Sequence, residues 1–111
     1  MPTNIHIAVD AMSGDFGPRS AMLAAQKTLL ARPNLWLTLV GDLSILSQLP
    51  SHSRIRLVST NSVVAMDDTP AFALRHGRNS SMAIALQQVA NNKAAACVSA
   101  GNTGAMVALA C

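Results

Sequence analysis

The residues best suited to chemistry lie near the end of the chain, in a glycine-containing loop between an apolar run and an apolar helix. Gly101 and Gly104 would let the backbone approach a ligand closely, and three side chains supply hydrogen-bond donors: Ser99, Asn102 and Thr103. The first N–H groups of a helix have no partners and carry the positive end of its dipole, so the loop predicts an anion site, most often for phosphate. A glycine turn with Thr103 as the helix N-cap is the alternative.

A second polar loop follows the first predicted strand, Ile5–Asp10. Two acidic residues flank it, Asp10 and Asp15, and Ser13 and Gly14 lie between them. A carboxylate repels a neighbouring phosphate unless it is protonated or orients donors. General acid or base catalysis by Asp10 and Asp15 is therefore one hypothesis. For Asp15, a turn-forming contact of the side chain with its own backbone is the alternative.

The middle of the chain carries further polar groups that we place in the same cleft. Asp67 and Asp68 precede a helix that starts at Pro70, so Asp68 or Thr69 is expected to cap that helix. Ser80 and Ser81 are expected to cap the next helix and not to act as nucleophiles, because no histidine within these motifs could activate them. Neither a metal site nor a cofactor is predicted.

Alternating strands and helices must position these loops. Strands are predicted at Ile5–Asp10, at 35–41, at 55–59 and from Ala96, with helices between them. This order is typical of an α/β fold in which a parallel sheet carries helices on both faces, a three-layer α/β/α arrangement. Ligands bind at the carboxyl ends of such strands, so all three polar loops should face one rim.

Side-chain patterns refine this fold. In the first helix, which starts near Pro18, Met22, Ala25 and Leu29 share one face, and Leu23 and Leu30 would widen it. Asp42 is expected to cap a short helix that runs through Leu49. The positions of Arg54 and Arg56 on one side of the third strand indicate an exposed face or an edge strand, whereas the apolar run around Cys97 predicts that the fourth strand is buried.

Composition points to a part of a larger protein. The 111 residues are 50% apolar and only 12% charged, and the apolar end of the chain has no helix-stopping residue. Residues 1–111 are therefore interpreted as the N-terminal part of a single α/β domain, with a short natural domain as the alternative. A net charge of +3 with 3% aromatic residues disfavours a nucleic-acid partner. Two cysteines without metal-ligand spacing and the lack of a leader pattern favour the cytoplasm.

Three motifs together resemble a known family. They are the run from Asp10 to Pro18; the middle set of Met66-Asp67-Asp68, Pro70, Ala73-Leu74-Arg75 and Ser80-Ser81-Met82; and the run from Val98 to Ala105. Their order and spacing closely resemble the bacterial phosphate acyltransferases of phospholipid synthesis, the PlsX family, and match the N-terminal part of that longer chain. The chain departs from the family pattern at Ser13, which is usually a glycine, at 76–79, where lysines are usual, and at Ala95, often acidic.

The resemblance implies an enzyme that moves a long-chain acyl group from acyl carrier protein to inorganic phosphate. The acyl phosphate would then serve a glycerol-3-phosphate acyltransferase. Asn102 and Thr103 are the expected phosphate ligands, with the N–H groups around Gly104, and Arg75 could offset the phosphate charge. The resemblance also implies a homodimer, and we expect peripheral contact with the inner face of the membrane.

Two other functions stay open at this point. One is a phosphate acetyltransferase that uses acyl coenzyme A, and the other is a non-catalytic chain that binds phosphate. The family's remaining site residues would lie beyond Cys111, so we expect these 111 residues alone to be inactive.

Overall fold

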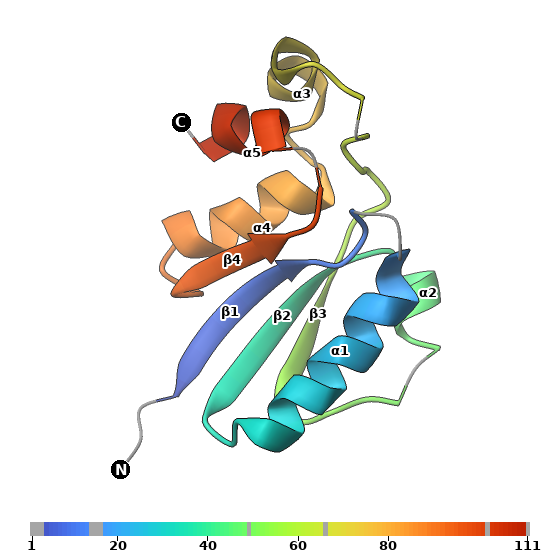
Figure 1. Ribbon diagram of the computed structural model, residues 1–111, viewed down its shortest axis with the longest axis vertical. Coiled ribbons are helices and arrows are strands. Elements are labelled where there is room, and N and C mark those ends of the chain that lie inside the picture. Colours follow the sequence, from blue (N-terminus) through green and yellow to red (C-terminus); the bar gives the residue numbers. More distant parts are fainter. Residues whose placement is uncertain (1–3, 14–16, 49, 66, 102, 111) are drawn as a thin grey trace.

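The computed structural model describes residues 4–13, 17–48, 50–65, 67–101 and 103–110. In this part of the chain, four strands form one sheet and helices pack around it (Figure 1). In chain order the elements are β1 (Ile5–Asp10), α1 (Gly17–Ala31), β2 (Leu35–Gly41), α2 (Leu43–Leu46), β3 (Ile55–Ser59), α3 (Pro70–His76), α4 (Ser81–Ala90), β4 (Ala96–Ser99) and α5 (Thr103–Ala110).

The strands lie in the order β3-β2-β1-β4 and all pairs are parallel. The chain therefore builds outward from β1 to β2 and β3, then crosses back and adds β4 on the other side of β1. In parallel α/β sheets, the point where the strand order reverses leaves a crevice at the carboxyl ends of the two strands. Here that point lies between β1 and β4.

Helices cover both faces of the sheet, as expected for the three-layer fold. On one face, α1 buries Met22, Ala25 and Leu29 against Leu37 and Leu39. On the other face, the buried residues come from β1, β2, α4 and the turn before β4: Ala8, Val40, Ala85 and Ala94. The parallel sheet with helices on both faces is thus confirmed, as is the predicted core face of α1.

Helices α3 and α5 lie side by side beyond α4, near the carboxyl ends of the strands (Figure 1). A third cluster of buried residues holds them there, formed by Val64, Ala73, Met82 and Ala105. Because Met82 belongs to α4, this cluster fixes the start of α4 beside α3 and α5.

Most predicted helix ends are confirmed. Asp42, Thr69 and Ser80 cap α2, α3 and α4, each accepting a hydrogen bond from a backbone N–H in the first turn. Helix α2 is shorter than predicted and ends at Leu46, because Ser47 closes it with a hydrogen bond from its N–H to Leu43 O.

Three expectations about exposure and helix starts are wrong. Leu23 and Leu30 are 52% and 83% exposed, because the face that α1 presents to the sheet is narrower than the apolar stripe. Strand β4 is not buried: Val98 is 56% exposed and Cys97 half-buried, since among the described strands β4 pairs only with β1 and forms an edge of the sheet. The last helix was expected to begin at Gly104, and α5 starts one residue earlier, at Thr103. The edge position predicted for β3 is confirmed.

Candidate functional site

Asp10 lies at the centre of the polar groups at the β1/β4 crevice. Its side chain is 4% exposed and accepts four hydrogen bonds from the described residues. Oδ1 accepts from the N–H groups of Met12 (3.2 Å) and Ser13 (3.3 Å). Oδ2 accepts from the hydroxyls of Ser13 (2.5 Å) and Ser99 (2.9 Å). The carboxylate thus binds its own loop and also the last residue of β4.

Ser99 transmits this contact to the loop that leads into α5. Asp10 and Ser99 are register partners in the parallel pair, so both side chains leave the sheet on the same face. The Ser99 hydroxyl donates to Asp10 and accepts from the N–H of Gly101 (3.1 Å). The loops after β1 and β4, predicted to share a rim, are therefore joined by hydrogen bonds.

Close packing joins the same two loops. A Cβ placed on Gly101 would lie 2.7 Å from the Cβ of Ser13 and 2.9 Å from Cε of Met82. Real Cβ atoms do not approach other heavy atoms this closely, so the site requires glycine at position 101. Gly101 was predicted to let the backbone approach a ligand, and the structure shows it approaching a neighbouring loop.

Helix α5 begins two residues after Gly101, with Thr103 as its first residue and Gly104 half-buried as its second. The N–H groups of its first turn have no partners inside the helix. The predicted anion site thus lies directly after the segment that Asp10 and Ser99 hold. Asn102, the side chain of Thr103, Gly14 and Asp15 lie outside the described residues.

The start of α4 is the third element at this place, because Met82 contacts Gly101. Ser80 is fully buried and acts as the predicted cap: its hydroxyl donates to Gly77 O (2.5 Å) and accepts from the N–H of Ala83 (3.2 Å). Ser81 is also fully buried, but its hydroxyl has no hydrogen-bond partner among the residues that the structure describes. The two adjacent serines therefore differ in what their hydroxyls do.

The third predicted loop is less closely connected. Asp67 is exposed, and Asp68 Oδ2 accepts from the N–H of Ala65 (2.8 Å), which closes a local turn. Arg75 is exposed in the last turn of α3, the helix that packs against α5. Within the described residues, no hydrogen bond joins these three side chains to Asp10 or Ser99. The structure thus brings two of the three loops together directly.

The charge of Asp10 also acts on a neighbouring thiol. Burial raises the pKa of Cys97, and the nearby carboxylate of Asp10 raises that pKa further. Cys97 lies two residues before Ser99 on the same face of β4, so this effect follows from the position of Asp10. A bound phosphate would meet the same negative potential, which the four donors around Asp10 partly offset.

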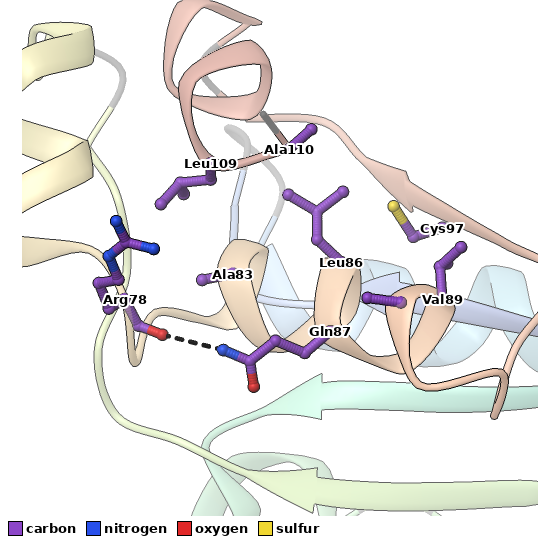
Figure 2. A pocket seen from close by; sticks show the side chains of 9 residues that line it. Arg78, Ala83, Leu86, Gln87, Val89, Cys97, Leu109 and Ala110 are labelled. Carbon is purple, nitrogen blue, oxygen red and sulfur yellow. Dashed lines mark hydrogen bonds between the residues drawn. The ribbon is translucent and has the colours of Figure 1, made fainter.

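A separate apolar groove lies between α4, β4 and the end of α5 (Figure 2). Its volume is about 380 Å³, and Leu86, Val89, Cys97 and Leu109 supply much of its lining. Arg78 lies at one end, where its carbonyl accepts a hydrogen bond from Nε2 of Gln87 (3.4 Å). Asp10, Ser13 and Ser99 do not line this groove, so it is distinct from the loop cluster.

Comparison with known proteins identifies the family of this chain. The model of the fatty acid synthesis protein family matches residues 5–111. The chain belongs to this family. It is 50% identical to the phosphate acyltransferase of Shewanella amazonensis, a match that covers 97% of this chain and 33% of that protein. It is 52% identical to a phosphate acyltransferase of Pseudomonas putida, over 93% of this chain and 32% of the relative.

These 111 residues of a member of the fatty acid synthesis protein family match only part of the length of its relatives. The phosphate acyltransferase of Saccharophagus degradans is 48% identical over the whole chain, which corresponds to 34% of that protein. The chain thus spans about a third of the length of the curated relatives it matches. None of the described helices is long and apolar enough to cross a membrane.

Proposed function

We propose that this chain forms the phosphate-binding part of an enzyme that transfers a fatty acyl group from acyl carrier protein to inorganic phosphate. One observation carries the proposal. The loops after β1 and β4 are joined at the point where the strand order reverses, directly before the start of α5. This is the place where parallel α/β sheets bind ligands, and a helix start suits an anion. The relatives' name, phosphate acyltransferase, supports the transfer of an acyl group to phosphate.

The reaction sets the demands on the site. A phosphate oxygen attacks the carbonyl carbon of the thioester, a C–O bond forms, the C–S bond breaks, and the thiol of the carrier leaves as a thiolate that water can protonate. The enzyme must hold phosphate against the carbonyl and donate hydrogen bonds to the developing oxyanion. In the proposed site, the first N–H groups of α5 and the side chains of Asn102 and Thr103 hold the phosphate, and Arg75 offsets its charge.

The other partners belong to the same proposal. Residues 1–111 act within a longer α/β domain that forms a homodimer in the cytoplasm and contacts the inner face of the membrane. A glycerol-3-phosphate acyltransferase consumes the acyl phosphate. Asp15 is proposed as a general acid or base, and Asp67 and Asp68 as groups that border the cleft.

The test uses the full-length enzyme that contains this segment. Acyl phosphate is trapped with hydroxylamine as the hydroxamate, with acyl carrier protein thioester or acyl coenzyme A as the donor and phosphate as the varied substrate. We expect product only when phosphate is present, and faster product formation from the carrier thioester. Faster turnover of short acyl coenzyme A esters would favour an acetyltransferase, and phosphate binding without product from either donor would favour a non-catalytic protein.

One substitution tests the phosphate site itself. Thr103→Val keeps the side-chain shape and removes a hydroxyl donor, which is worth about 1.5–3 kcal/mol when the partner is charged. We expect roughly ten- to hundredfold weaker affinity for phosphate with little change for acyl carrier protein. Ser59→Ala, at the exposed end of β3, is the matched control and should leave the phosphate curve unchanged. An unchanged curve for Thr103→Val would remove this residue from the site.

A further inference from the structure

We propose that Asp10 and Ser99 form a positioning pair, which sets the place of the phosphate-binding N–H groups without touching phosphate or moving a proton. The inference rests on the proposed function and deepens it. In this proposal Asp10 orients hydrogen-bond donors. That role replaces the general acid or base role that the sequence suggests for Asp10.

The hydrogen bonds of Asp10 leave no room for a role as a base. A carboxylate offers about four lone-pair sites. In this chain four donors occupy them: two backbone N–H groups of the same loop and the hydroxyls of Ser13 and Ser99. The side chain is also 4% exposed, so a substrate atom could reach it only after these bonds open.

Ser99 is committed in the same way. A serine hydroxyl has one proton, and that proton is donated to Asp10. One lone pair accepts the N–H of Gly101. The hydroxyl of Ser99 therefore has no proton to give to a phosphate, although the sequence suggests it as a donor.

The pair acts on the ligand site through Gly101. Asp10 fixes the rotamer of Ser99, Ser99 fixes the N–H of Gly101, and α5 begins two residues further on. Ser13 and Met82 close the other side of Gly101, so the loop can move only if the contact with the β1 loop opens. An error of about 1 Å in the position of a binding group can reduce rates a hundredfold, so such a restraint matters for catalysis.

The test compares four variants of the full-length enzyme with phosphate as the varied substrate. They are Asp10→Asn, Ser99→Ala, the double variant and Ser99→Thr. We expect each of the first two to raise KM for phosphate about ten- to a hundredfold, with KM for acyl carrier protein and the pH profile of kcat unchanged. The double variant should have a KM for phosphate no higher than that of the single variant with the larger defect, because both substitutions break the same chain of hydrogen bonds. Ser99→Thr keeps the hydroxyl and should restore most of the lost affinity.

Asp42→Asn is the matched control. Asp42 follows the neighbouring strand β2, and its carboxylate accepts hydrogen bonds from the N–H and hydroxyl of Ser44 as the cap of α2. The control should lower stability without changing KM for phosphate.

Two results would overturn the proposal. One is a fall in kcat of about 10²–10⁴ in Asp10→Asn with loss of the acidic limb of the pH profile, as expected of a general base. The other is additive effects in the double variant.

A second measurement separates this inference from the proposed function. The amide resonances of Gly101 and Gly104 should shift together in Asp10→Asn and in Ser99→Ala but not in Asp42→Asn, whether or not the enzyme makes acyl phosphate. If the wild type makes no product and these shifts occur, the proposed function fails while the positioning pair stands. If Asp10→Asn leaves the Gly101 amide where it was, the positioning pair is overturned.

Discussion

A methyl group on Gly101 would lie 2.7 Å from the Cβ of Ser13. The loop after β4 therefore contacts the loop after β1 at a residue that has no side chain. Gly101→Ala should therefore push the loop after β4 away from the loop after β1. We expect KM for phosphate to rise at least about tenfold, because the start of α5 moves with that loop. Steady-state kinetics with phosphate as the varied substrate measures this effect.

Gly17→Ala is the matched control for that substitution. Gly17 has φ +72°, and among the described residues no atom lies within 4 Å of an added Cβ, so alanine there meets backbone strain. It should cost about 1–2 kcal/mol of stability without changing phosphate affinity. Equal effects of the two substitutions on KM for phosphate would contradict the packing argument.

Substitution by alanine should lower stability at Ser80 but not at Ser81. Ser80→Ala removes the cap of α4 and leaves Gly77 O without its hydroxyl donor, so thermal unfolding should show a loss of about 1–2 kcal/mol. Ser81→Ala removes a buried hydroxyl for which the described part of the chain offers no hydrogen-bond partner, and should be neutral or stabilising. A clear loss of stability in Ser81→Ala would show that its hydroxyl has a partner in solution.

Arg54 should contribute to stability although it was expected only to mark an edge strand. Its guanidinium donates three hydrogen bonds of 2.8 Å to backbone carbonyls at and after the end of α1: those of Leu29, Arg32 and Leu35. Arg54→Met keeps an apolar stem but leaves these carbonyls without their donor, so we expect a loss of about 1–3 kcal/mol in denaturant unfolding. Arg56→Met, in an exposed position of β3, should change stability by less than about 0.5 kcal/mol.

The thiol of Cys97 reports on the charge of Asp10. Burial and the Asp10 carboxylate both raise the pKa of Cys97, so less thiolate is present at a given pH and alkylation should be slow at pH 8. In Asp10→Asn the second cause is removed, the pKa falls, and alkylation at pH 8 should become faster. Site-resolved mass spectrometry separates Cys97 from Cys111. If Asp42→Asn accelerates the reaction equally, local opening and not charge is responsible.

Much of the fold was predictable from local patterns. The bounds of the first three strands are those predicted, because each is a largely apolar run with turn residues at its ends. The caps Asp42, Thr69 and Ser80 were predictable because few side-chain types can accept the first N–H groups of a helix. Burial was less predictable, as Leu30 and Val98 show, because exposure depends on which elements become neighbours.

The candidate site shows the same limit more clearly. The types and positions of Asp10, Ser13 and Ser99 were singled out from the sequence, but their mutual hydrogen bonds were not. Those bonds require β4 to pair with β1, whereas chain order alone would place β4 beside β3. Helix α4 packs against β1, β2 and β4, and local patterns do not contain that long-range arrangement.

The strand order also sets when the site can form during synthesis. Strands β1, β2 and β3 with α1 and α2 occupy the first 59 residues and can pair as soon as they leave the ribosome. Ser99 follows Asp10 by 89 residues, which takes roughly 4–18 s at the usual rate of elongation. During that interval Asp10 has no partner from β4. The groups proposed to hold phosphate are therefore assembled only after β1, β2 and β3 have been synthesised.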